Sequence, residues 1–361
     1  MGDATGRRRY LDWARGLAVL IMIQAHVLDS WTRLDVRGSW QYAWAMIVAG
    51  FGAPMFLFLA GVAVALSAGS KLRRTGDSRA AASAVMNRGA WIFFLAFLFR
   101  IQAWALGWGP ARSLLKVDIL NIMGPSIVAA GALWGTLKNR RQRLAAFTSS
   151  AVAIAILTPI VCGMPMLDGL PDPLEAYLRP LRGFSSFCLF PWAGFVFAGA
   201  VVGVLLDDVR TPEEESRLNA WLAIAAASLA VAAYAGSFLP SPYAHSEFWG
   251  SSPSFFAIRV GILALILPVA YLWERQVVSG SWSPMEQLGR SSLFIYWIHV
   301  EMVYGLLSLR IHKTLSHPQV WAAYVAFVIL MLLCSIGKDQ MVRWWNGRRN
   351  QSAYLIESRT F

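Results

Sequence analysis

Two histidines stand within strongly apolar stretches of the chain, and a carboxylate follows the first of them. His26 lies in the stretch 15–31, and Asp29 comes three positions later, on nearly the same face of a helix. His299 lies in a second such stretch, 291–309. A neutral imidazole can take a proton from a hydroxyl or an amine, and a nearby carboxylate can orient it. These types and spacings predict three catalytic residues, although His299 could instead bind substrate, and either histidine could simply lock two helices together.

The depth of both histidines within a membrane supports a functional role. A helix rises about 1.5 Å per residue, which places His26 about 16 Å beyond Arg15 and His299 about 13 Å beyond Arg290. The hydrocarbon core of a bilayer is about 30 Å thick. Both imidazoles would therefore lie near its middle, where ionisable groups are costly and indicate function by default.

A second set of polar residues borders other apolar stretches. Arg100 ends one stretch, Asp118 opens the next, and Asn121 follows three positions later. Arg182 precedes the stretch that contains Trp192, where the adjacent proline predicts a kinked helix beside a cavity. We predict that these five residues bind substrate or donor, with an arginine holding a hydroxyl or an acyl carbonyl. A purely structural ion pair between Arg100 and Asp118 is the alternative.

Basic residues gather at the opposite ends of the stretches. Arg15, with Asp12 three positions before it, and Arg290 belong to a basic rim that also includes residues 71–74 and 138–143. Such a rim suits the phosphates of a donor such as acetyl-CoA, so Arg15 and Arg290 are predicted donor-binding residues. The enrichment of basic residues in cytoplasmic loops explains most of the rim without any ligand.

The composition indicates the elements that must position these residues. Of the 361 residues, 57% are hydrophobic and 14% are charged, whereas about 25% of a soluble protein is charged. We predict an all-α, polytopic transmembrane helix bundle that forms one integral-membrane domain over residues 1–361. The ten predicted spans are residues 14–33, 44–67, 89–107, 117–137, 144–163, 184–206, 220–239, 254–272, 291–309 and 318–336.

The distribution of lysine and arginine predicts the topology. The inner segments implied by these spans hold 21 basic residues and the outer loops hold 7, which places both termini in the cytoplasm. The same asymmetry explains the net charge of +12, so a nucleic-acid partner is excluded. No CxxC or His/Cys spacing indicates a metal site.

Four segments carry a resemblance to a known family. Arg9–Met22 followed by His26, Gly52–Gly61, Leu189–Gly194 and Leu288–Leu293 resemble signatures of the heparan-alpha-glucosaminide N-acetyltransferase-like family, one of the transmembrane acyltransferases. The resemblance implies a membrane enzyme of ten or eleven helices that moves an acetyl group from cytosolic acetyl-CoA to a sugar on the far side.

The resemblance also implies a role for one residue and shows one departure. His26 falls where the family places a polar catalytic residue, which is asparagine in the animal lysosomal enzyme and commonly histidine in bacterial relatives. The animal enzyme has a further catalytic histidine in the following outer loop, whereas this chain has no histidine in Val36–Ser39. The animal substrate and mechanism therefore do not transfer intact.

The sequence as a whole predicts a multi-pass acyltransferase of a bacterial inner membrane. It would take acetyl-CoA as co-substrate, with no metal, and would acylate an amino or hydroxyl group of a sugar or cell-envelope glycan. Its other partners would be membrane lipid and, if the protein forms a homodimer, a second copy of the chain. A transporter or carrier of a small polar or lipid-linked substrate is the alternative, because buried ionisable groups and a broken helix suit that class as well.

Overall fold

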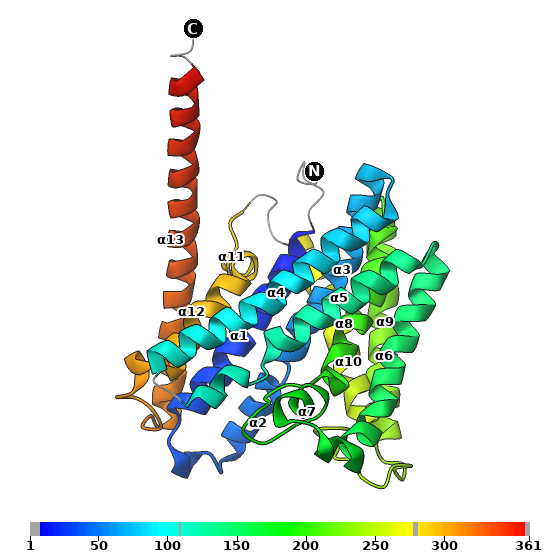
Figure 1. Ribbon diagram of the computed structural model, residues 1–361, viewed down its shortest axis with the longest axis vertical. Helices are drawn as coiled ribbons and strands as arrows, with labels where there is room; N and C mark the ends of the chain where they lie inside the picture. Colours follow the sequence, from blue (N-terminus) through cyan, green and yellow to red (C-terminus); the bar gives the residue numbers. More distant parts are fainter. Residues whose placement is uncertain (1–7, 108–109, 277–280, 358–361) are drawn as a thin grey trace. The chain divides into compact units, whose positions relative to one another are not determined.

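The structure is a computed structural model that describes residues 8–107, 110–276 and 281–357, and this part of the chain is helical (Figure 1). The chain divides into two compact units. The first unit consists of Met1–Ala49 and Val278–Phe361, and the second consists of Gly50–Val277. The predicted all-α bundle is confirmed, and each unit is described separately below.

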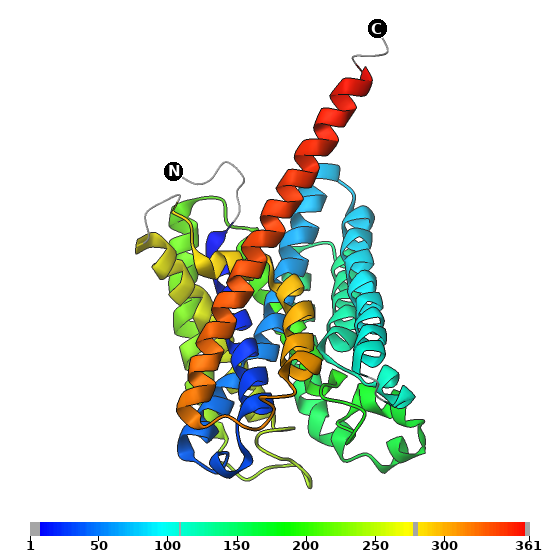
Figure 2. The same ribbon diagram turned by 90° about the vertical axis from the view of Figure 1, so that its left-hand side faces the viewer.

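The first unit joins the beginning of the chain to its end. Its elements are α1 (Arg9–Trp31), η1 (Leu34–Val36), α2 (Trp40–Ala49), α11 (Pro284–Arg290), α12 (Ser292–Tyr304), η4 (Leu306–Ser308) and α13 (His317–Glu357). Helix α1 packs against α11, α12 and α13, and Figure 2 shows α12 and α13 running beside it. Glycines allow the closest approach, because a Cβ on Gly16 would overlap the carbonyl of Met285 and one on Gly289 would overlap that of Asp12.

The structure differs from the ten predicted spans at one place. Nine helices of the described residues are long and apolar enough to cross a membrane. The predicted span 291–309 is instead the 13-residue helix α12 followed by η4. Helix α12 ends before Gly305, whose extended backbone (φ −83°, ψ −170°) separates it from η4, and its 13 residues are fewer than a membrane-spanning helix requires.

The second unit is built around α8. Its elements are α3 (Gly52–Thr75), α4 (Ser78–Gly107), η2 (Ala111–Leu115), α5 (Ile119–Thr136), α6 (Arg140–Cys162), η3 (Pro165–Gly169), α7 (Asp172–Leu178), α8 (Leu189–Asp207), α9 (Pro212–Gly236) and α10 (Pro253–Gln276). Helix α8 packs against α3, α5 and α6. A Cβ on Gly199 would overlap the carbonyl of Phe58, and one on Gly61 would overlap that of Val196. Small residues thus bring α3 and α8 into backbone contact.

The predicted distortion of α8 is confirmed at its first turn. Phe190 has a non-helical backbone conformation (φ −102°, ψ 115°), directly before Pro191. Because proline cannot donate a backbone hydrogen bond, a helix readily changes direction here. The distortion brings Trp192 to the beginning of the regular part of α8.

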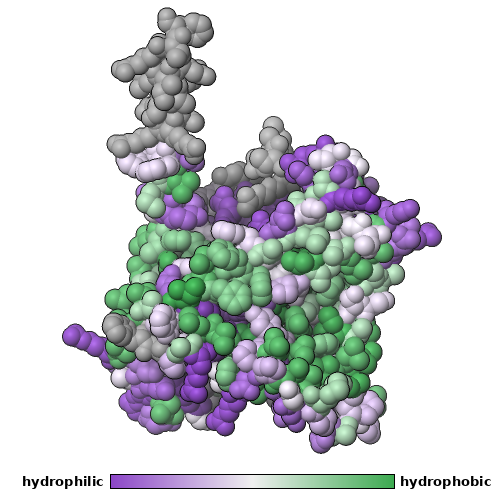
Figure 3. Space-filling model, in the orientation of Figure 1, coloured by the Kyte–Doolittle hydropathy of each residue, from purple (hydrophilic) through white to green (hydrophobic). Residues whose placement is uncertain are grey.

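Helices α4 and α9 present apolar side chains to the outside of the second unit. Trp91 on α4 and Trp221 and Val231 on α9 are more than half exposed. Figure 3 shows hydrophobic residues covering much of the surface over the helices of this unit, with hydrophilic residues gathered at their ends. Helices that bury few of their apolar residues require lipid to cover them.

The charge distribution gives a testable topology. We expect reporter fusions at Asn139 and Phe361 to be cytoplasmic and a fusion at Ser246 to lie on the opposite side, because basic residues accumulate in the inner segments. Alkaline phosphatase activity should be high only at Ser246, and green fluorescent protein should fluoresce only at the other two sites. The same side for Ser246 and Phe361 would contradict the topology.

Candidate active site

The two predicted catalytic histidines are in direct contact within the first unit. His26 Nδ1 on α1 lies 2.7 Å from His299 Nε2 on α12. The two ring planes differ by 7° and their centroids are 5.0 Å apart, so the rings are nearly coplanar and the hydrogen bond joins them edge to edge. Residues 273 positions apart in the chain therefore form one imidazole pair.

The backbone determines which nitrogen of each ring carries a proton. His299 Nδ1 lies 2.7 Å from the carbonyl oxygen of Ile295, which can only accept a hydrogen bond. His299 Nδ1 must therefore be protonated, and in the neutral ring its Nε2 is an acceptor. That acceptor requires a proton on His26 Nδ1. His26 Nε2 is then left with a free lone pair, which is what a general base or a nucleophile needs.

Burial distinguishes the roles of the two rings. The side chain of His299 is completely buried, whereas His26 is only partly buried. Within the described structure, His299 is the only hydrogen-bond partner of His26, so no protein group occupies its Nε2. In this arrangement a substrate could reach His26 Nε2, whereas the buried His299 can act only by holding His26 through their hydrogen bond.

Asp29 has different partners from those that its spacing predicts. Its Oδ2 accepts a hydrogen bond of 2.9 Å from the hydroxyl of Tyr304, and its Oδ1 lies 3.8 Å from the guanidinium of Arg37. The Asp29 side chain is 52% exposed, and the described structure has no hydrogen bond between it and His26. The residue that orients His26 is His299, while Asp29 acts on the imidazole only as a nearby charge.

Tyr304 is a site residue that the sequence does not reveal. Its ring meets His26 edge-on, with centroids 5.6 Å apart, while its hydroxyl reaches Asp29. Tyr304 lies five positions beyond His299, a spacing that is not typical of one helical face. Tyr304 is identified as a site residue only by the hydrogen bond from its hydroxyl to Asp29 on α1, which the sequence does not show.

Backbone acceptors fasten α1 to its neighbours on both sides of His26. Gln24 Nε2 donates to the carbonyl of Ala45 on α2 (3.0 Å). Ser30 Oγ and Trp31 Nε1 both donate to the carbonyl of Val303 on α12 (2.8 and 3.2 Å). The bonds of Ser30 and Trp31 hold α1 against α12 about one turn beyond the imidazole pair, and the bond of Gln24 holds α1 against α2 on the other side of His26.

The predicted donor-binding residues of the first unit, Arg15 and Arg290, belong to the region where the other end of α1 packs against α11. Arg15 forms an ion pair of 2.8 Å with Asp12, whose side chain is buried. Arg290 is exposed and directly follows Gly289, which packs against the backbone of Gly16. Both arginines thus lie where α1 meets α11, and their role in binding the donor stays a prediction.

In the second unit, the predicted pair of Arg100 and Asp118 forms. Arg100 Nη2 lies 3.0 Å from Asp118 Oδ2, and both side chains are largely buried. The other oxygen of Asp118 caps α5 by accepting from the backbone N–H groups of Leu120 and Asn121. Burial raises the pKa of the Asp118 carboxyl, and the positive charge of Arg100 opposes that rise. The ion pair favours the structural interpretation, whereas the buried Arg100 Nε, which has no hydrogen-bond partner among the described residues, leaves a donor for a substrate oxygen.

Asn121 and Trp192 belong to the same region as that ion pair. The Asn121 amide donates to the hydroxyl of Tyr177 (3.1 Å). Trp192 packs, with Tyr177, against an apolar cluster formed by Val117, Ile122 and Ala176. The structure therefore brings four of the five predicted residues of the second unit close together, namely Arg100, Asp118, Asn121 and Trp192.

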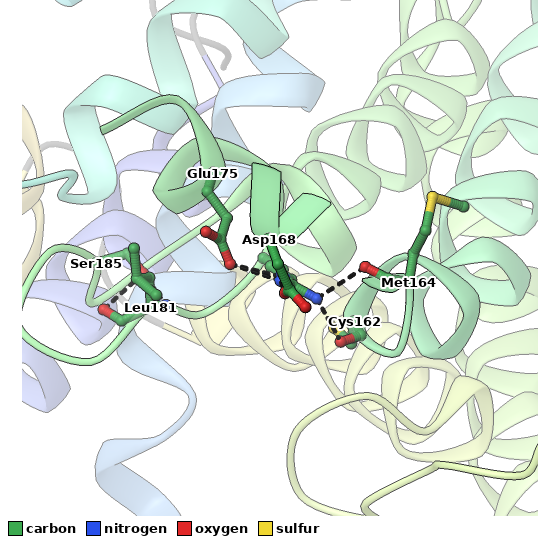
Figure 4. Close-up of polar contacts among 7 residues, drawn as sticks. Cys162, Met164, Asp168, Glu175, Leu181 and Ser185 are labelled. Atoms are coloured by element: carbon green, nitrogen blue, oxygen red, sulfur yellow. Dashed lines mark hydrogen bonds and ion pairs between the residues drawn. The ribbon is translucent and has the colours of Figure 1, made fainter. Parts of the chain in front are cut away.

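A different arginine organises the loop that precedes α8. Arg179 binds the carboxylates of Glu175 and Asp168 and donates to the backbone carbonyls of Met164 (3.0 Å) and Cys162 (3.4 Å) (Figure 4). A planar guanidinium with five donors can hold several acceptors at once. Arg179 is therefore a structural tie between the end of α6 and α7.

Arg182 stands apart from these contacts. It is exposed, and the described structure shows no hydrogen bond or ion pair for it. Its predicted role in substrate binding consequently has no geometric support. As for metals, the described residues contain no cluster of three or more His, Cys, Asp or Glu side chains arranged to hold an ion.

A comparison with protein families assigns the chain to a group of enzymes. Residues 7–236 match the model of the heparan-alpha-glucosaminide N-acetyltransferase catalytic domain. The match includes His26 and Asp29 but ends before His299. No curated protein matches the chain. The family match extends over well over half of the sequence, and the protein therefore belongs to the heparan-alpha-glucosaminide N-acetyltransferase catalytic family, whose members are membrane acetyltransferases.

Proposed function

We propose that this protein transfers an acetyl group from cytosolic acetyl-CoA to an amino or hydroxyl group of a sugar or cell-envelope glycan on the outer side of a bacterial inner membrane. The observation that carries the proposal is the unoccupied Nε2 of His26, with its tautomer set by His299 and the carbonyl of Ile295. A neutral base in a membrane-embedded site suits acyl transfer to a neutral nucleophile. The whole chain serves as one catalytic domain.

In the proposed step, His26 acts as a general base. The acceptor nitrogen or oxygen attacks the thioester carbonyl carbon while His26 Nε2 takes its proton. The tetrahedral intermediate then collapses, the carbon–sulfur bond breaks and the thiolate of coenzyme A leaves. The proton on His26 passes to that thiolate, which restores the neutral imidazole and releases coenzyme A as a thiol.

His299 stabilises the charge that develops on His26 in this step. When His26 Nε2 gains a proton, the ring becomes an imidazolium, and its Nδ1–H donates a stronger, charge-assisted hydrogen bond to His299 Nε2. The carbonyl of Ile295 polarises His299 in the same direction. The pair resembles the logic of a nucleophile–base–orienter triad, with a neutral imidazole and a carbonyl in the place of a carboxylate.

The ends of α1 have separate roles in the proposal. Arg15 and Arg290 bind phosphates of the donor on the cytoplasmic side. Asp29 and Tyr304 lie on the accessible side of His26 and supply a hydrogen-bond acceptor and an aromatic edge to the acceptor sugar. An exposed carboxylate favours acceptors that carry hydroxyl or amino groups over acidic ones.

Sealed proteoliposomes provide the test. Acetyl-CoA with a radiolabelled acetyl group is added outside, and glucosamine or a glycan oligosaccharide is enclosed. Because the reconstituted protein faces both ways, the fraction with its cytoplasmic side outward is measured by protease accessibility. We expect labelled acetyl-sugar inside and free coenzyme A thiol outside, in equal amounts.

Two results would contradict the proposal. Movement of the unmodified sugar across the vesicle membrane, without release of coenzyme A thiol, would identify a transporter. Acetyl transfer that occurs only when acetyl-CoA is supplied to the outer side of the protein would show that the acetyl group moves in the opposite direction across the membrane.

A further inference from the structure

One partly buried arginine of the second unit has no anionic partner among the residues that the structure describes. Arg259 lies in the second turn of α10, within a segment that is long and apolar enough to span a membrane. Its Nε atom is buried and has no hydrogen-bond partner among the described residues. In this part of the chain no acidic side chain forms an ion pair with it, in contrast to Arg100 and Arg179, which bind carboxylates.

An unpaired guanidinium at this position is energetically unfavourable without a ligand. Charged side chains within membrane-spanning helices are rare, and they pair with one another or mark the path of a substrate or ion. The free-energy cost of removing a charged group from water is offset only when an opposite charge lies nearby and hydrogen-bond partners satisfy its donors. The contacts of Arg259 meet neither requirement.

Aromatic rings form the surroundings of Arg259. Its guanidinium lies 4.1 Å from the centre of the Phe255 ring and 5.9 Å from that of Trp192 on α8. Phe255 in turn packs on Phe248 and Trp249, with ring centroids 5.0 and 4.9 Å away. The rings hold the guanidinium in place by cation–π contact but leave its N–H donors without acceptors.

The two helices that meet here add positive potential. Trp192 is in the first turn of α8 and Arg259 in the second turn of α10, so the N-terminal end of each helix is nearby. Helix N-termini carry a partial positive charge. A partly buried cation, two helix N-termini and the absence of a compensating carboxylate among the described residues together favour the binding of an anion.

We propose that Arg259 and Trp192 form a binding site for a phosphate group. The planar guanidinium matches the oxygens of a phosphate, and the aromatic rings exclude water and strengthen the contact. A phosphate can reach a membrane-embedded arginine from an anionic lipid headgroup or from a phosphate-bearing soluble ligand. The inference does not depend on the proposed reaction, because it concerns binding in the second unit alone.

The test measures ligand binding to delipidated protein in dodecyl maltoside, a detergent without phosphate. Phosphatidylglycerol, coenzyme A and inorganic phosphate are titrated separately, and the unfolding temperature is followed by tryptophan fluorescence. A ligand that binds the folded state raises this temperature by mass action. We expect at least one probe to stabilise the wild type, and its affinity to fall about 10- to 100-fold in Arg259→Gln, the loss of one charged hydrogen bond. Arg112→Gln removes an exposed arginine of the same unit and should respond like the wild type.

The pattern of responses identifies the source of the phosphate. Stabilisation by phosphatidylglycerol alone indicates a lipid site, and stabilisation by coenzyme A or inorganic phosphate indicates a soluble ligand. Arg259→Lys keeps the charge and should keep part of the response, which guards against a folding defect. The proposal is overturned if no probe stabilises the wild type, or if Arg259→Gln responds to every probe as the wild type does.

Discussion

Replacing His26 with alanine is expected to reduce acetyl transfer about 10²- to 10⁴-fold, the usual effect of losing a general base. The reason is that, of the four ring nitrogens in the His26–His299 pair, only His26 Nε2 has no hydrogen-bond partner among the described residues, and its ring is partly exposed. The measurement is the release of coenzyme A thiol and of acetylated acceptor by purified protein in nanodiscs. The variant should still insert and fold, because His26 contributes no backbone contact between helices.

A matched histidine in the same unit controls for this variant. His312 is exposed and, within the described structure, forms a hydrogen bond only with Ser30, so His312→Ala should retain nearly normal turnover. A His26→Ala protein with near-normal turnover would make His26 a structural residue and would transfer the catalytic assignment to His299. Stable labelling of the wild type by acetyl-CoA in the absence of acceptor would instead show an acetyl-histidine intermediate, and His26 would then be a nucleophile.

The sequence indicated which ionisable residues lie within apolar helices better than it indicated their partners. Hydropathy and depth identified His26 and His299 separately, because an ionisable residue within an apolar stretch is visible in one dimension. Their mutual hydrogen bond is not, since it depends on how α1 and α12 pack. Helical spacing placed Asp29 near the face of His26, but spacing does not determine where a side chain points, and Asp29 is held by Tyr304.

The fold was predictable to a similar extent. Apolar length predicted the all-helical bundle, and Pro191 predicted the distortion in α8. The pair of Arg100 and Asp118 was predictable because the two residues flank one short connection. The early end of α12 within the predicted span 291–309 was not, because the apolar residues continue beyond Gly305, and a single glycine in an apolar stretch does not by itself predict the end of a helix.

The second large effect is expected at His299, which acts on the reaction through His26. His299→Leu removes the acceptor that His26 Nδ1 requires, and the imidazolium formed during transfer then has no partner. The cost of one charged hydrogen bond corresponds to about a 10- to 100-fold loss in kcat. KM for the acceptor should change little, since the completely buried His299 does not line an accessible surface.

His299→Gln provides the matched comparison, because a glutamine oxygen can accept from His26 Nδ1 while its amide donates to the carbonyl of Ile295. It should recover most of the kcat that His299→Leu loses, whereas a purely space-filling role would make the two variants alike. Nitrogen-15 spectra report the cause directly. In the wild type, His26 should be protonated at Nδ1 and unprotonated at Nε2, and His299→Leu should abolish that preference. Two results would contradict the proposed chain of hydrogen bonds from His26 through His299 to the carbonyl of Ile295: equal kcat values for the two variants, or protonation of His26 at Nε2 in the wild type. The proposed effect of His299 depends entirely on the direction of those two hydrogen bonds.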